Sequence, residues 1–65
     1  METKIKRYFN EKQVSEITGL SLPTLRNYRH LRKGPPYHKV GRAVRYADTD
    51  LSRFMESKKI QTDET

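Results

Sequence analysis

Cysteine is absent from the 65-residue sequence, and histidine occurs only twice, at His30 and His38. The chain therefore has no disulfide and no thiolate ligand, which is typical of proteins in a reducing compartment. Neither histidine has the neighbouring cysteine, aspartate or glutamate residues that would complete a tetrahedral metal site. We expect no metal centre and no cofactor.

Long apolar runs are also lacking. Hydrophobic residues make up only 32% of the sequence, and no stretch approaches the length of a membrane span or of a signal-peptide core. We expect a cytoplasmic protein without membrane contact. A chain of 65 residues forms one domain with a small core, so its stability is expected to be marginal.

The elements of an enzyme site are missing as well. The sequence has no cysteine nucleophile, no phosphate-binding loop and no carboxylates placed to converge on a histidine. So short a chain also encloses little pocket volume. We expect neither an enzyme nor a small-molecule ligand.

What the sequence does contain is a concentrated positive charge. Its net charge is +6 at pH 7, and residues 21–46 hold seven lysines and arginines and no acidic residue. The remaining residues hold seven basic and eight acidic ones, so they contribute only −1. A basic segment of this kind attracts polyanions, nucleic acids in particular.

Glycine and proline divide the chain into short periodic segments. Outside these segments, both ends are polar and lack periodicity. We expect residues 1–7 to form a flexible basic arm, residues 8–59 the folded domain and residues 60–65 a disordered tail.

A first helix is predicted over residues 11–18. Asn10 is a favoured N-cap, and Gln13 stands three positions later to complete a capping box. The glycine that follows the segment favours the left-handed conformation that ends a helix. The two glutamates of this helix, Glu11 and Glu16, are expected to point to water.

A second helix is predicted over residues 22–31. Ser21 can cap it, and Pro23 fits the first turn, where a missing N–H is harmless. The glycine and two prolines at positions 34–36 are expected to stop it. Two short helices joined by a tight turn are typical of a helix-turn-helix, in which the second helix enters the major groove of DNA.

Residues 37–46 favour a β-hairpin, because aromatic and β-branched residues flank a turn at Gly41-Arg42-Ala43. This hairpin is expected to form a wing. A third helix is predicted to run from an N-cap at Asp48 to residue 58 or 59, with apolar residues spaced at i, i+3 and i+4.

The expected fold is mainly α with a small β-hairpin wing, that is, a winged helix-turn-helix. The apolar positions of the predicted elements form the expected core. His38 is expected to be partly buried, because it shares a strand face with Val40. The expected core residues are Phe9, Val14, Ile17, Leu20, Leu25, Tyr28, Val40, Val44, Leu51 and Phe54.

Several stretches are distinctive in combination. They are EKQVSEITGLSLPT at 11–24, GPPY at 34–37, KVGR at 39–42, VRY at 44–46 and the following Asp50-Leu51. With them, residues 8–55 resemble the small excisionases and AlpA-type regulators of bacteria and phages, relatives of the MerR DNA-binding domain. Thr18 and Tyr28 depart from the leucine and tryptophan that are frequent at these positions, which concerns packing rather than DNA contact.

The resemblance implies a winged helix-turn-helix that binds double-stranded DNA, either as a recombination directionality factor or as a transcriptional regulator. An excisionase would act beside an integrase and neighbouring copies of itself, whereas a regulator would occupy a promoter. Both roles imply association with the nucleoid.

The outward face of the second helix is expected to enter the major groove, and helical projection from Leu25 defines that face. Arg26 can donate a bidentate pair to guanine, and Asn27 can pair with adenine. The free N–H groups at the helix start suit a phosphate. The expected groove residues are Ser21, Pro23, Thr24, Arg26, Asn27 and His30.

Further basic residues are expected to contact the DNA backbone or the minor groove, which attracts arginine when it is narrow. Arg42 lies at the hairpin turn. Lys39 and Arg45 alternate with the two valines of the hairpin, which predicts that both lie on its outer face. The expected backbone and wing contacts are Arg29, Lys39, Arg42 and Arg45.

Several of these site residues have a structural alternative. Asn27 and His30 also suit an ordinary exposed helix surface, and Arg29 lies near the core edge, where a phosphate contact and a snorkelling side chain are both compatible with its position. The same basic face would also suit an RNA-binding or protein-interaction adaptor. Proteins that bind single-stranded RNA, however, usually expose more aromatic residues for stacking on the bases.

Overall fold

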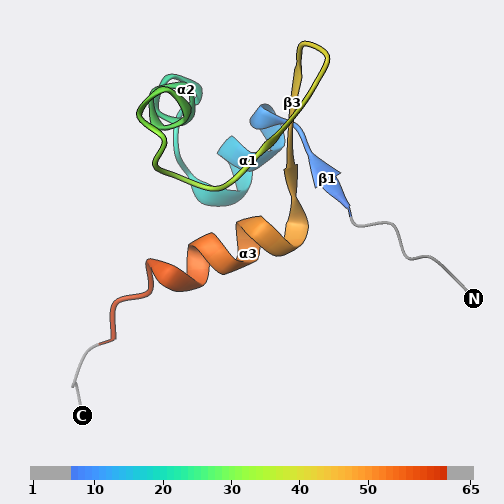
Figure 1. Ribbon diagram of the computed structural model, residues 1–65. Coiled ribbons are helices and arrows are strands. Elements are labelled where there is room, and N and C mark those ends of the chain that lie inside the picture. The colour runs from blue at the N-terminus through green and yellow to red at the C-terminus, as the bar shows by residue number, and fades with distance from the viewer. Residues whose placement is uncertain (1–6, 62–65) are drawn as a thin grey trace, which may run out of the picture.

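The computed structural model describes residues 7–61, so residues 1–6 of the predicted arm and 62–65 of the predicted tail lie outside the described range. Within it, three helices and a three-stranded antiparallel sheet confirm the predicted winged helix-turn-helix (Figure 1). The elements in chain order are β1 (Tyr8–Phe9), α1 (Glu11–Thr18), α2 (Leu22–Leu31), β2 (His38–Val40), β3 (Ala43–Ala47) and α3 (Asp48–Ser57). Across residues 7–61, none of the helices has the length and apolar character needed to span a membrane.

Helices α1 and α2 begin and end at the predicted residues. The Gln13 N–H donates to Asn10 Oδ1 at 2.8 Å, and the Asn10 N–H donates to Gln13 Oε1 at 2.9 Å, so the capping box is present. Gly19 follows α1 with a φ of 82°. The C-cap of α2 is Arg32, which has a left-handed conformation with a φ of 58°.

The sheet has the order β1-β3-β2, with β3 in the centre. Strand β1, which pairs Tyr8 with Ala47, was not predicted, because two residues are too few to show a period. Strands β2 and β3 form the predicted hairpin, which extends away from α3 in Figure 1. Val40 pairs with Ala43, so the turn contains two residues, Gly41 and Arg42, rather than the predicted three.

This shorter turn changes which side of the hairpin each residue of β2 faces. A three-residue turn would place Val40 opposite Val44, whereas the observed pairing places Lys39 opposite Val44. Residues directly opposite each other share a face, and a shift of one residue turns every side chain of a strand over. The prediction that Val40 and His38 lie on the core face was therefore wrong. Val40 is 64% exposed, and His38 is exposed as well.

The core lies where the three helices meet β3. It consists of Val14, Leu25, Tyr46 and Leu51, with Phe9, Leu20, Leu22 and Val44 packed against it. Tyr46 is fully buried and has the largest side chain among these, although it was not among the predicted core residues. Ile17 was predicted to be buried but is 50% exposed, whereas Tyr28 and Phe54 are partly buried.

Helix α3 begins one residue earlier than predicted. Ala47 is the N-cap, in extended conformation, and Asp48 is already helical. The reason is that β3 continues without a loop into α3, and the Asp48 N–H donates to the Arg7 carbonyl oxygen at 2.9 Å. The last helical residue is Ser57, just short of the predicted end.

Gly34 lies against the Tyr28 ring with a φ of 104°, and a Cβ at this position would come within 2.9 Å of Tyr28 Cβ and Cδ2. We expect Gly34→Ala to lower the free energy of unfolding by about 2 to 4 kcal/mol, from backbone strain and overpacking together. Urea denaturation measures this loss. Gly41→Ala is the matched control, since Gly41 has a φ of 64° and nothing within 4 Å of its Cβ position. Equal losses in the two variants would contradict the steric account.

Candidate nucleic-acid interface

One face of α2 is exposed to solvent, and the opposite face is anchored in the core by the fully buried Leu25. The predicted groove residues lie on or beside the exposed face. Ser21, Pro23, Arg26, Asn27 and His30 are exposed, and Thr24 is half-buried. The helix itself contains no acidic residue. Its exposed surface therefore presents neutral polar groups, proline and positive charge, with one large apolar side chain, Leu31, 53% exposed at its last residue.

The start of α2 is held by Ser21 and Thr24. Ser21 Oγ accepts from the Thr24 N–H at 3.2 Å and donates to Thr24 Oγ1 at 2.9 Å. These bonds fix the first turn, where free backbone N–H groups and the positive end of the helix dipole favour an anion. The arrangement suits a phosphate contact at this end of α2.

The hairpin carries the three predicted wing residues in different settings. Arg42 lies at the exposed turn, and Lys39 is exposed on β2. Arg45 is half-buried, and its Nη1 donates to the Val44 carbonyl oxygen at 2.8 Å. Because Lys39 pairs with Val44 and Arg45 with His38, Lys39 and Arg45 lie on opposite faces. The prediction that both occupy the outer face was therefore wrong for Lys39.

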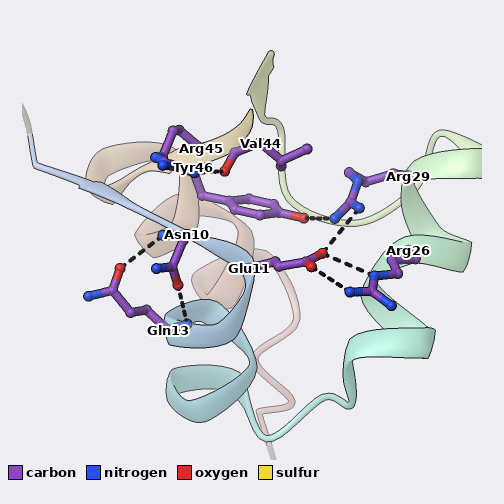
Figure 2. A network of polar contacts seen from close by, with 8 residues as sticks. All are labelled: Asn10, Glu11, Gln13, Arg26, Arg29, Val44, Arg45 and Tyr46. Carbon is purple, nitrogen blue, oxygen red and sulfur yellow. Dashed lines mark hydrogen bonds and ion pairs between the residues drawn. The ribbon is translucent and has the colours of Figure 1, made fainter. Parts of the chain in front are cut away.

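Between α2 and the hairpin lies a network centred on Glu11 (Figure 2). Its carboxylate accepts from Arg26 Nη2 at 2.7 Å and Nε at 3.3 Å, and from Arg29 Nη2 at 3.2 Å. Arg29 Nη1 also donates to the Tyr46 hydroxyl at 2.8 Å. The prediction that Glu11 points to water was therefore wrong, since this side chain joins α1 to α2.

The two arginines of this network differ in exposure. The Arg26 side chain is 56% exposed, so its guanidinium is accessible from solvent. The Arg29 side chain is only 17% exposed, and its guanidinium lies 5.7 Å from the centre of the Tyr37 ring. Arg26 is therefore open to a ligand, whereas Arg29 is held at the edge of the core.

The ion pairs shift the pKa values of all three groups. Hydrogen bonding to Arg26 is the largest effect that lowers the pKa of Glu11, so the carboxylate stays ionised near neutral pH. The same hydrogen bond raises the pKa of Arg26. Burial opposes the charge of Arg29, but hydrogen bonds to Tyr46 and Glu11 raise its pKa overall. The network therefore carries one negative and two positive charges.

A hollow next to this network separates the start of α1 from the hairpin. It is lined by Asn10, Glu11, Arg42, Ala43, Val44 and Arg45. Within residues 7–61, no group of three or more histidine, cysteine, aspartate or glutamate side chains is placed to hold a metal ion. The exposed face of α2, the Glu11 network and the hairpin turn thus form the candidate interface.

Glu11 and Tyr46 are the two members of this region that were not predicted to belong to it. The signal available in the sequence is the spacing of Arg26 and Arg29, which places two guanidinium groups on neighbouring turns of one helix. That spacing permits a shared acidic partner. It does not identify the partner, which lies 15 and 18 residues away in the chain.

Comparison with known proteins agrees with this geometry. The family model described as "Helix-turn-helix domain" matches residues 8–59. No curated protein and no solved structure gives a significant match. The match spans most of the chain and includes every helix and strand described above. The chain therefore belongs to the helix-turn-helix domain family, a family of DNA-binding domains that includes excisionase-like and AlpA-like proteins.

Proposed function

We propose that this protein binds double-stranded DNA in a sequence-specific manner. Helix α2 lies in the major groove, and the β2–β3 hairpin contacts the backbone or the adjacent minor groove. The observation that carries this proposal is the exposed face of α2, which combines Arg26 and Asn27 with a complete absence of acidic residues from that helix. A basic, polar helix face of this kind suits the donor and acceptor pattern of base edges.

On this face, base reading is assigned to Arg26 and Asn27, which pair in favourable geometry with guanine and adenine respectively. Pro23 and His30 lie on either side of them along the groove. Ser21 and Thr24, at the helix start, contact a phosphate and fix the register of α2 on the duplex. Arg29, whose charge is largely engaged within the protein and whose side chain is 17% exposed, is assigned a contribution to the local potential and a phosphate contact at the edge of the interface.

The hairpin supplies the second set of contacts. Arg42, at the exposed turn, reaches farthest toward the DNA. Lys39 and Arg45 leave the hairpin on opposite faces, so positive charge is available on both sides of it. This distribution suits the two phosphate strands that border a minor groove.

This division of roles predicts different effects for two alanine variants. Asn27→Ala is expected to reduce the preference for the selected sequence over random duplex by about 1 to 3 kcal/mol, because a base contact is lost. Arg42→Ala is expected to weaken binding to both duplexes by the same factor, because a phosphate contact carries no sequence information. The target is first obtained by selection from a randomised duplex library, and fluorescence anisotropy then gives the affinities.

Arg53→Ala is a control for the loss of charge alone, because Arg53 is an exposed arginine of α3, outside the candidate interface. It is expected to preserve both the affinity and the preference. Identical effects of Asn27→Ala and Arg42→Ala on selected and random duplexes would contradict the assigned roles. Preferential binding of single-stranded RNA in a competition assay would contradict the choice of duplex DNA and favour an RNA-binding adaptor.

The biological role proposed for this binding is site-specific excision, together with an integrase and neighbouring copies of the protein, or transcriptional regulation on the nucleoid. The support is the family, which includes excisionase-like and AlpA-like proteins. Footprinting on an attachment region, with excision measured in the presence and absence of the protein, tests the first role. A footprint confined to promoters, without any effect on excision, would favour the second.

A further inference from the structure

The Glu11 carboxylate stands in the middle of a basic surface that is proposed to meet phosphates. It lies beside the exposed face of α2 and lines the hollow that leads to the hairpin. A free carboxylate in this place would repel DNA. Glu11 is not free, because two guanidinium groups donate to it, and its side chain is only 27% exposed. A glutamate in this position therefore needs a function that compensates for the repulsion between its negative charge and the DNA phosphates.

The direction of the hydrogen bonds indicates that role. Arg26 uses Nε and Nη2, which form one edge of the planar guanidinium, to grip both carboxylate oxygens. The other edge, with one N–H from Nη1 and one from Nη2, makes no hydrogen bond within residues 7–61. A guanidinium has five donors in a rigid fork, so holding one edge fixes the direction of the other. That free edge has the geometry that matches O6 and N7 of guanine.

We propose that Glu11 is a positioning residue that orients Arg26 to read a guanine in the major groove. The inference rests on the proposed function, since it requires α2 to lie in that groove. An arginine with a fixed fork loses less conformational freedom on binding than a mobile one. It also tolerates fewer acceptor arrangements. Glu11 therefore favours discrimination between bases over indiscriminate attraction to phosphate.

Arg29 and Tyr46 hold the Glu11 carboxylate in a fixed position. Arg29 donates to Glu11 at 3.2 Å and to the hydroxyl of the fully buried Tyr46 at 2.8 Å. The carboxylate is thus anchored to the core strand β3 as well as to α1. Because two guanidinium groups share one carboxylate, the three side chains together retain a charge of +1. DNA therefore meets a positive surface despite the glutamate.

The test compares Glu11→Gln with Glu16→Gln. Both variants remove one negative charge from α1, but Glu16 is exposed and makes no ion pair within residues 7–61. Each protein is used to select duplexes from a randomised library, and affinities are measured for duplexes that differ at single base pairs. Glu11→Gln is expected to reduce the preference for guanine at one position by about fivefold or more, and to bind random duplex more tightly than the wild type. Glu16→Gln is expected to retain the guanine preference.

A second variant identifies the base that is read. Arg26→Lys keeps the positive charge but removes the fork, so it is expected to lose the preference for the same guanine. If Glu11→Gln is too unstable to study, Glu11→Asp provides the same comparison, because its shorter side chain withdraws the carboxylate from Arg26. Circular dichroism establishes that each variant is folded before binding is measured.

The outcomes separate this inference from the function on which it rests. A wild-type protein that selects no duplex sequence overturns both. A wild type that selects a guanine-containing sequence, together with a Glu11→Gln variant of unchanged preference, overturns only the positioning role. The same holds if Glu11→Gln strengthens binding to all sequences equally, or if the variants at Glu11 and Arg26 change the preference at different base pairs.

Discussion

Replacement of Tyr46 by alanine is expected to unfold most of the protein at 25 °C. The Tyr46 ring is fully buried and has the largest side chain in the core, where it packs with residues of α1, α2 and α3. Truncation of a buried aromatic residue to alanine costs about 3 to 5 kcal/mol. A domain of this size gains about 3 to 5 kcal/mol at most from its core, so the loss is comparable to the whole stability.

Tyr46→Phe separates the ring from its hydroxyl. The phenylalanine variant keeps the packing and loses the hydrogen bond from Arg29, which is 2.8 Å long, so we expect it to lose only about 1 kcal/mol. Thermal denaturation followed by circular dichroism measures both variants. A Tyr46→Ala protein that melts cooperatively near the wild-type temperature would show that the ring is not essential to the core.

The helices were predictable because their signals are local. Asn10 and Gln13 form a capping box through groups three residues apart, so the local sequence is sufficient to predict where α1 begins. The outward face of α2 was predictable for a related reason. Once Leu25 is known to be buried, the helical period determines which neighbours are exposed. This is why Asn27 and His30 lie where they were expected.

The hairpin was predicted as an element but not in its register. A turn of two residues or of three fits the sequence around Gly41 equally well, and the difference decides whether Lys39 or Val40 shares a face with Val44. Tyr46 was missed from the core although strand alternation places it on the same face as Val44, which was predicted to be buried. Its full burial also reflects the position of β3 at the centre of the sheet.

The Glu11 network could not be predicted, because it depends on how α1 packs against α2. Glu11 is the first residue of α1 and, by local criteria, an ordinary acidic residue in a first helical turn. Its contact with Arg26 is made across 15 residues of chain and at a specific angle between the two helices. Helical periodicity describes each helix separately and contains no information about that angle.

The affinity for duplex DNA is expected to fall steeply with increasing salt. The groups available for phosphate contact are the start of α2, Lys39, Arg42, Arg45 and the partly neutralised Arg29. Contacts to about four to six phosphates give a slope of about −4 to −5 for log K against log salt concentration. Between 50 and 200 mM salt, this slope corresponds to an affinity loss of about 250- to 1,000-fold.

This slope tests the central claim most directly, because it counts the phosphates that the proposed interface neutralises. Fluorescence anisotropy with one labelled duplex at several salt concentrations provides it for the wild type, Arg42→Ala and Arg53→Ala. We predict a slope of about −4 to −5 for the wild type and for Arg53→Ala, and a slope smaller in magnitude by about 1 for Arg42→Ala. A wild-type slope near zero would contradict an interface formed by α2 and the hairpin. So would a slope that is smaller in magnitude than the wild-type slope for Arg53→Ala but unchanged for Arg42→Ala.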